Sequence, residues 1–242
     1  MGLPAAFSSG KYDMLSELKG SIESYYYSFD TAKLEELLER AENLYDSAAA
    51  GWHAEYYASV LHIQLGKIYY NDDPDFALEH FEKAAELLKD IDEDTENCEI
   101  KTLLSNAYGK ISSLSGITAF IHGITAKEYI YEAYELNREN PKFMLIAATH
   151  LMHTPAAFGG DKDKAEKLLK RALQKNGEFK EKDDLMLNWA EDAEIYAYLA
   201  QLEILRENEK KARKYMDKAL ELVPEYGFVL IDLQSQLDSL VD

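Results

Sequence analysis

Residues 196–224 read YAYLAQLEILRENEKKARKYMDKALELVP and contain two amphipathic helical patterns in succession. Asn208 lies between the patterns and is a residue type that favours the start of a helix. Pro224 follows the second pattern, and proline does not continue a helix because it lacks a backbone N–H. The apolar and small residues recur at helical spacing: Tyr196, Leu199 and Ala200 in the first pattern, and Ala212, Met216 and Ala219 in the second. The stretch therefore predicts two helices joined by a short turn.

The second of these patterns recurs earlier in the chain. It consists of an alanine, a large apolar residue four positions later and another alanine three positions after that. Two small residues on one face let a neighbouring helix approach closely, and the large residue fills the groove between them. The earlier copies are Ala77/Phe81/Ala84, Ala126/Ile130/Ala133 and Ala165/Leu169/Ala172, with a weaker copy at Leu34/Leu38/Ala41. We expect repeated helix pairs that pack through these small-residue seams.

The composition also favours helices. The chain has only four valines in 242 residues, whereas a sheet protein of this length needs many more β-branched residues. A hydrophobic content of 47% supplies a core and excludes a disordered chain. We therefore expect an all-α fold, with a capping box at Thr125 and Glu128 that starts one helix. Apolar stripes place the helices near residues 33–45, 52–70, 76–88, 126–136, 165–173, 185–205 and 212–222.

A fuller motif surrounds the alanine pattern. Leu65, Gly66 and Tyr69 precede Ala77, and the equivalent residues precede the alanines of the opening stretch. This order of residues is similar to the tetratricopeptide repeat (TPR) and covers most of residues 12–227. The resemblance implies an α-α superhelix, a TPR-like solenoid of about five helix pairs. Successive first alanines are 39 to 49 residues apart, compared with about 34 in the family, so longer helices or inserted loops are implied.

The domain organisation predicted from these patterns is simple. Residues 12–242 form one TPR-like domain, preceded by a disordered or trimmed segment at residues 1–11. The run from Asn140-Pro141 through Pro155 to Gly159-Gly160-Asp161 is similar to a bacterial subgroup of TPR-like proteins and indicates no chemistry. The first residues lack the basic region of a signal peptide but fit the remnant of one. The localisation stays open between cytoplasm and periplasm, as does the oligomeric state.

Two segments do not fit a short helix–turn–helix unit and are expected to be inserted loops, at residues 115–124 and 153–160. Both fall between the first and second helix of consecutive repeats, so a stacked solenoid places them side by side. Each contains glycine, an aromatic residue and histidine. Together they suggest an alternative function, a small-ligand or solute-binding accessory protein with a loop pocket made by Phe120, His122, His153 and Phe158.

Charge restricts the possible partners. The formal net charge is −19, which argues against nucleic acid because phosphate binding requires clustered Lys and Arg. The same charge argues against adhesion to anionic membranes and is compatible with a basic protein partner. No apolar run is long enough to span a bilayer, so no membrane insertion is expected.

Candidate catalytic and metal-binding patterns are weak. His150 and His153 are spaced for one helix face, but no acidic residue lies beside them as in a zinc-binding helix. The acidic run at residues 90–96 resembles a calcium loop, but Thr95 replaces the required glycine and Lys101 the closing glutamate. No nucleophile motif or dinucleotide fingerprint occurs. We expect no enzyme activity, no metal and no cofactor.

The TPR resemblance implies that the first helix of each pair lines a concave surface that binds a peptide of a partner protein. The principal hypothesis is a non-catalytic adaptor or scaffold. Clustered tyrosines such as Tyr25-Tyr26-Tyr27 cannot all face one core, and exposed tyrosine favours recognition. Some family members clamp a carboxylate with Lys, Arg and Asn, but only Lys67, Asn106 and Lys110 are of that kind here. The implied concave residues are Lys67, Tyr70, Asn106, Lys110, Thr149, Met152 and Gln201.

The seams give a test of the helix faces. Ala133→Trp places a bulky side chain in a predicted seam and should lower the free energy of unfolding by about 1–3 kcal/mol through overpacking. Glu135→Trp, on the predicted outer face, is the control and should leave the melting temperature unchanged. Equal effects of the two substitutions in thermal unfolding would show that the face assignment is wrong.

Overall fold

The computed structural model describes residues 9–45 and 51–240, and within these ranges the chain is helical with no strand. The expected all-α fold is confirmed. The helices are α1 (Ser9–Tyr25), α2 (Thr31–Tyr45), α3 (Trp52–Tyr69), α4 (Pro74–Asp94), α5 (Cys98–Leu114), η1 (Gly116–Thr118), α6 (Ala119–Asn137), α7 (Pro141–His153), η2 (Ala156–Phe158), α8 (Lys162–Asn176), α9 (Asp192–Ile204), α10 (Glu209–Leu222), η3 (Phe228–Leu233) and α11 (Gln234–Asp238). α1 begins three residues before the expected domain boundary at residue 12, and residues 1–8 lie outside the described ranges.

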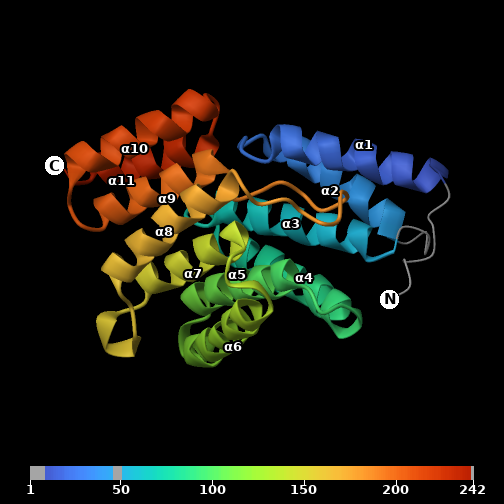
Figure 1. The fold of residues 1–242 in the computed structure, drawn as a ribbon, viewed down its shortest axis with the longest axis horizontal. Helices are drawn as coiled ribbons and strands as arrows, with labels where there is room; N and C mark the ends of the chain where they lie inside the picture. Colours follow the sequence, from blue (N-terminus) through green and yellow to red (C-terminus); the bar gives the residue numbers. More distant parts are fainter. Residues whose placement is uncertain (1–8, 46–50, 241–242) are drawn as a thin grey trace.

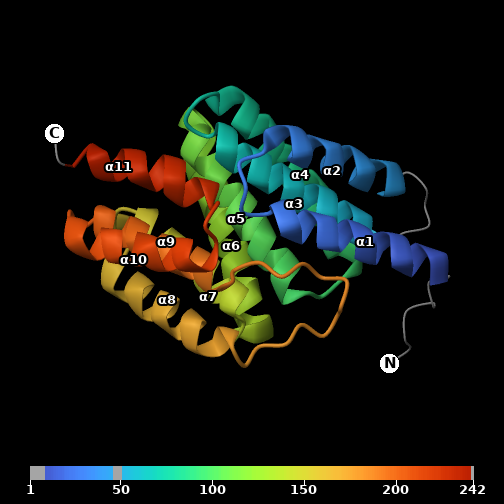
Figure 2. The ribbon, with the colours of Figure 1, turned by 90° about the horizontal axis from the view of Figure 1, so that it is seen from above.

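Consecutive helices pack as antiparallel pairs, and the pairs stack into a curved array (Figures 1 and 2). The pairs are α1/α2, α3/α4, α5/α6, α7/α8 and α9/α10, followed by η3 and α11. This agrees with the predicted solenoid of about five helix pairs. The first helices of the pairs lie on the inner side of the array, where their side chains meet.

The predicted seams are buried between the helices of each pair. The alanines at 77, 84, 126, 133, 165, 172, 212 and 219 are all at most 2% exposed. In the α3/α4 pair, a Cβ atom added to Gly66 would lie 2.8 Å from the ring of Phe81. Glycine at this point of the motif therefore lets α4 approach α3 closely enough for Phe81 to be fully buried.

One of the two expected inserted loops is mostly helical. η1 and the first turns of α6 occupy residues 116–124, so the predicted loop at 115–124 is wrong. The expected capping box is wrong too, because Thr125 lies inside α6 and its hydroxyl donates to the carbonyl of Ile121 at 3.3 Å. Residues 119–124 contain no proline, so the helix is able to begin upstream at Ala119. Residues 154–161 do form a connection, containing η2, and Asp161 caps α8 by accepting from the backbone N–H groups of Asp163 and Lys164.

The connection between α8 and α9 is the main departure from a plain solenoid. Residues 178–191, here called the strap, contain no described helix, although a helix was expected from about residue 185. The strap crosses from the end of α8 back to α3 and α1 (Figures 1 and 2). Its apolar side chains from Leu185 to Ala190 are buried, and Tyr57 donates a hydrogen bond to the carbonyl of Leu185 at 2.7 Å. The apolar run that suggested a helix therefore packs as an irregular turn against the first helices.

A buried carboxylate fixes the strap in place. Glu99, in the first turn of α5, accepts hydrogen bonds from the Tyr56 hydroxyl of α3, the Lys142 ammonium of α7 and the Trp189 indole N–H at 2.6 Å. Lys142 also donates to the carbonyl of Leu187 at 2.8 Å. All four side chains are at most 4% exposed. The Glu99 cluster, defined by Tyr56, Glu99, Lys142 and Trp189, thus joins three first helices and the strap.

The Glu99 cluster predicts a strong dependence of stability on one carboxylate. Glu99→Ala removes the nearer of the two carboxylates that pair with the buried Lys142 ammonium, leaving only Glu181 at 3.3 Å, and should lower the free energy of unfolding by about 3–5 kcal/mol in urea denaturation. Glu86→Ala breaks the exposed Lys83–Glu86 pair at 2.9 Å and serves as the control, with no measurable loss expected. A loss for Glu99→Ala no greater than for the control would contradict this account.

Candidate functional site

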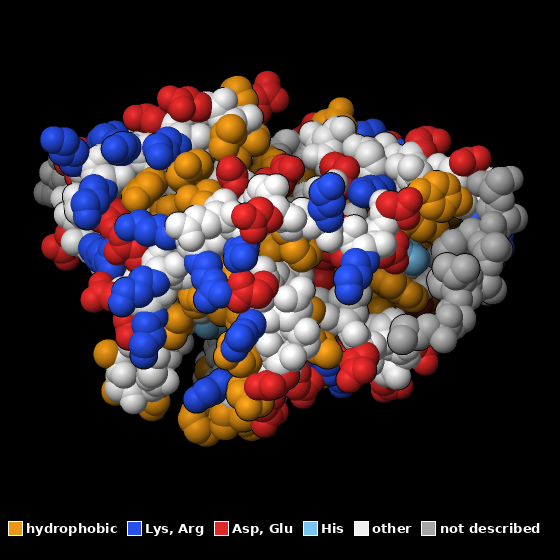
Figure 3. Space-filling view, in the orientation of Figure 1, with side chains coloured by type: hydrophobic (Ala, Val, Ile, Leu, Met, Phe, Trp, Pro, Cys, Tyr) orange, Lys and Arg blue, Asp and Glu red, His pale blue; other side chains and the backbone are white. Residues whose placement is uncertain are grey.

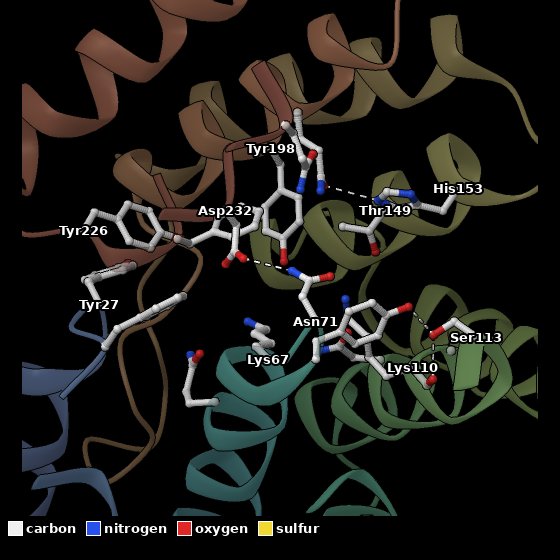
Figure 4. Close-up of a pocket in the computed structure, with 18 of the residues that line it drawn as sticks. Tyr27, Lys67, Asn71, Lys110, Ser113, Thr149, His153, Tyr198, Tyr226 and Asp232 are labelled. Atoms are coloured by element: carbon white, nitrogen blue, oxygen red, sulfur yellow. Dashed lines mark hydrogen bonds between the residues drawn. The ribbon is translucent and has the colours of Figure 1, made fainter. Parts of the chain in front are cut away.

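The inner side of the array is divided into two halves. The strap and the Glu99 cluster fill the half formed by the N-terminal turns of α3, α5 and α7. The C-terminal turns of the same helices, with α9, surround a cavity of about 450 Å³. We call this the concave cavity (Figure 4). The α1–α2 turn and the C-terminal segment from Tyr226 onward complete its wall.

Six of the seven residues predicted for the concave surface line this cavity. α3 supplies Lys67 and Tyr70, α5 supplies Asn106 and Lys110, and α7 and α9 supply Thr149 and Gln201. Met152 does not, since it is buried in the core with the other apolar residues of α7. The adjacent His153 occupies the inward position instead, because the inward face of α7 runs through residues 149, 150 and 153. The participation of the six residues in binding stays a prediction.

Of the four residues of the alternative loop pocket, only His153 lines the concave cavity. Its Nε2 lies 3.2 Å from Oε1 of Gln201. His122 stacks on the ring of Tyr108 at a centroid distance of 6.1 Å, whereas Phe120 and Phe158 extend into solvent. The structure therefore does not bring Phe120 and Phe158 to the cavity. The candidate pocket for the alternative function is the concave cavity and not the predicted loop pocket.

One wall of the cavity is aromatic and was not predicted from the sequence. Tyr26, Tyr27 and Phe29 come from the α1–α2 turn, and Tyr226 and Phe228 come from the segment after the last helix pair. The tyrosine cluster at 25–27 signalled a recognition surface, but nothing in the repeat pattern indicates that the two ends of the chain meet. Tyr27 and Tyr226 pack edge to face with ring centroids 4.8 Å apart.

The two ends of the array are joined by the backbone as well. The N–H of Gly227 donates to the carbonyl of Tyr27 at 2.9 Å. A Cβ atom on Gly227 would lie 2.4 Å from the ring of Phe29, so a side chain here would push the ends apart. The concave surface is consequently closed on this side and forms a cavity, whereas an open superhelix would leave a through-running groove.

The charges of the cavity are unequally paired. Lys67 contacts Glu194 at 3.4 Å, whereas no carboxylate among the described residues lies within salt-bridge distance of Lys110. Lys110 instead lies over the ring of Tyr70, 4.8 Å from its centroid. Burial and the neighbouring Lys67 lower the pKa of Lys110 to about 8. Across the cavity, Asp232 accepts a hydrogen bond from Asn71 at 3.0 Å, and burial raises the pKa of its carboxyl group.

His150 is held neutral in the cavity wall. The Ser105 hydroxyl donates to the carbonyl of Ala126 at 2.7 Å, so at its 2.8 Å contact with His150 it accepts from Nε2–H. Burial and the nearby His153 lower the pKa of His150 to about 4. At neutral pH the cavity therefore carries the positive charges of its lysines and not of this imidazole.

Solved structures resemble the whole chain. The TPR protein TTC0263 of Thermus thermophilus matches with a TM-score of 0.64 and 20% identity, covering 96% of this chain and 98% of that one. The HusA haemophore of Porphyromonas gingivalis matches with a TM-score of 0.62 and 20% identity, covering 85% of this chain and 94% of that one. The chain has the TPR-like fold. No family model matches the sequence, and neither does any curated protein.

Within the TPR-like fold, the described residues contain no group of three or more His, Cys, Asp or Glu side chains placed to hold a metal ion. No described helix is long and apolar enough to cross a bilayer. The concave cavity is lined by lysines, the Asp232 carboxylate, amide groups and aromatic rings. Ligand sites in proteins combine such polar groups with aromatic side chains.

The neutral state of His150 predicts a pH dependence. Its pKa in the folded chain is below the ordinary value of 6.5, so its contribution to stability is complete above pH 6.5 and is lost as the pH falls towards 4. His150→Gln removes the titrating group and should gain about 2 kcal/mol of stability relative to wild type between pH 7 and pH 4.5. Urea denaturation at several pH values measures this difference, and parallel curves for the two proteins would contradict it.

Proposed function

We propose that this chain is a non-catalytic adaptor whose concave cavity binds the C-terminal residues of a partner protein. The observation that carries the proposal is Lys110, a half-buried ammonium group that faces the cavity with no carboxylate among the described residues within salt-bridge distance, although Asp232 attracts it from farther away. A buried charge without a partner is costly, and a bound carboxylate would compensate it. The TPR-like fold supports an interaction scaffold in general.

The size and closure of the cavity favour the end of a chain. A volume of about 450 Å³ is in the range of small-ligand sites and accommodates a few residues at most. The Gly227–Tyr27 hydrogen bond and the strap obstruct the path of a long peptide through the array. A chain terminus enters such a cavity from one side without needing an exit.

The cavity lining suggests how such a terminus is held. The carboxylate pairs with Lys110, and Asn106 beside it on α5 and Gln201 on α9 offer amide N–H groups. The last side chain of the peptide packs against Tyr27 and Tyr226 of the aromatic wall and against Tyr198 of α9. Outside the cavity the acidic surface, with a net charge of −19, favours partners that are basic upstream of their C-terminus.

A second candidate function is the binding of a small anionic molecule in the same cavity. The observation that favours it is the closure of one side of the array, since a partly closed aromatic cavity also suits an aromatic carboxylate. The fold is shared with a protein named as a haemophore, so it is compatible with a carrier role. This candidate keeps the ligand class predicted from the two loops and moves it to the concave cavity.

The two functions are separated by a binding experiment with defined probes. A library of peptides with random C-terminal hexamers is screened, and each hit is synthesised with a free and with an amidated C-terminus. We expect free peptides to bind at least about tenfold more tightly than amidated ones. Lys110→Gln should abolish this preference, whereas Lys214→Gln, at an exposed position of α10, should preserve it.

The same peptides give a check by pH. Because the pKa of Lys110 is about 8, affinity for free peptides should fall as the pH rises from 7 to 9.5, and should not change for Lys110→Gln. Equal binding of free and amidated peptides would contradict the proposed function. Absence of peptide binding together with binding of small aromatic carboxylates would replace it with the second candidate.

A further inference from the structure

Two apolar tips extend from the same edge of the molecule. One tip is η1 with the start of α6, where Ile117 is fully exposed, Phe120 is 71% exposed, and Ile121 and Ile124 are also exposed. The other is η2, where Phe158 is 72% exposed. Figure 1 shows both segments at the lower edge of the array. We call these five residues the apolar edge.

The tips are free of charge in a highly charged chain. Residues 111–126 and residues 143–160 contain no Asp, Glu, Lys or Arg, although such residues make up 29% of the sequence. The exposed Ile and Phe side chains on these stretches therefore have no carboxylate beside them on the same segment. This charge-free edge contrasts with an overall net charge of −19.

The shape of the apolar edge distinguishes between a protein surface and a lipid bilayer as its binding partner. Figure 3 shows two lobes at the lower edge with a hollow between them and apolar side chains on their outer ends. A rigid protein surface must match both lobes and the hollow, and such interfaces are rimmed by polar groups. The interfacial region of a bilayer deforms around separate protrusions and accepts Phe and aliphatic side chains without a matching shape.

We propose that the apolar edge docks the protein on the surface of an uncharged, zwitterionic lipid bilayer. Ile117, Phe120 and Phe158 reach below the headgroups, and the rest of the fold stays in water. Absence of carboxylates from the tips permits this contact, whereas the net charge of −19 opposes docking on anionic lipid. The contact is peripheral, since no described helix is able to span the bilayer.

Docking by this edge also places the concave cavity near the bilayer. Ser113, at the end of α5, lines the cavity four residues before Ile117. His153, at the end of α7, lines it five residues before Phe158. The tips are therefore direct extensions of the helices that form the cavity wall, and a ligand of the cavity would be met at the membrane surface. The docking itself does not depend on the proposed ligand.

The test is flotation of the full chain with vesicles of pure dioleoyl phosphatidylcholine. The wild-type protein should float with the vesicles, and the double variant Phe120→Ser/Phe158→Ser should show at least about a tenfold lower ratio of bound to free protein, since two buried aromatic side chains are lost. Leu230→Ser/Ile231→Ser is the matched control, because these residues are 49% and 56% exposed on η3, away from the apolar edge. The control should float like wild type.

Three further readouts complete the test. Replacing a third of the lipid with phosphatidylglycerol should reduce wild-type flotation, and Lys110→Gln should leave it unchanged. Thermal unfolding verifies that the serine variants are folded, as expected for exposed positions. Absence of wild-type flotation, or equal loss in the control, overturns the proposal. A wild-type dimer in light scattering that Phe120→Ser/Phe158→Ser converts to monomer, without flotation, assigns the edge to a second copy instead.

Discussion

The arrangement of the inner surface depends on a single buried carboxylate. Glu99 collects donors from α3, α7 and the strap, so removing it affects four segments that are distant in sequence. Its partner Lys142 also binds the backbone of Leu187, which fixes the strap and not only the helices. A buried ion pair gains little stability over apolar packing, but it specifies geometry because each partner is costly to leave unpaired.

The strap determines where a ligand is able to bind. By filling the inner side beside the N-terminal turns of α3, α5 and α7, it leaves only the C-terminal turns exposed to a cavity. The meeting of Tyr27 with Tyr226 and Gly227 then closes the array at its open side. A fold that usually presents a long groove here presents a chamber, which is why both proposed functions involve a short anionic ligand.

Lys110 and the apolar edge are the two places where the chain departs from ordinary packing. A half-buried ammonium with no carboxylate in salt-bridge distance and five exposed apolar side chains both reduce stability or solubility. The alanine seams, in contrast, are buried as helix packing requires, and the buried carboxylates Glu99 and Glu194 are paired with lysines. Departures of this kind concentrate at functional surfaces, because a bound partner there offsets the stability that the free protein loses.

The sequence by itself determined the helices, their pairing and most of the inward-facing residues. Helical periodicity and the alanine seams are local features that predict the helices, and the TPR resemblance that they carry implied that Lys67, Tyr70, Asn106, Lys110, Thr149 and Gln201 lie on one surface. Met152 was misplaced because a one-residue error in register rotates a helix position by about 100°.

Tertiary structure alone decided the strap, the closure of the array and the extent of α6. Leu185, Met186 and Leu187 satisfy a helical pattern, and it is their tertiary contacts, with Tyr56, Tyr57 and Lys142, that hold them in an irregular turn instead. Likewise, nothing local connects Tyr27 with Gly227, since two hundred residues separate them. Interactions between residues far apart in sequence leave no periodic signal, so the cavity that they create becomes visible only when the chain is folded.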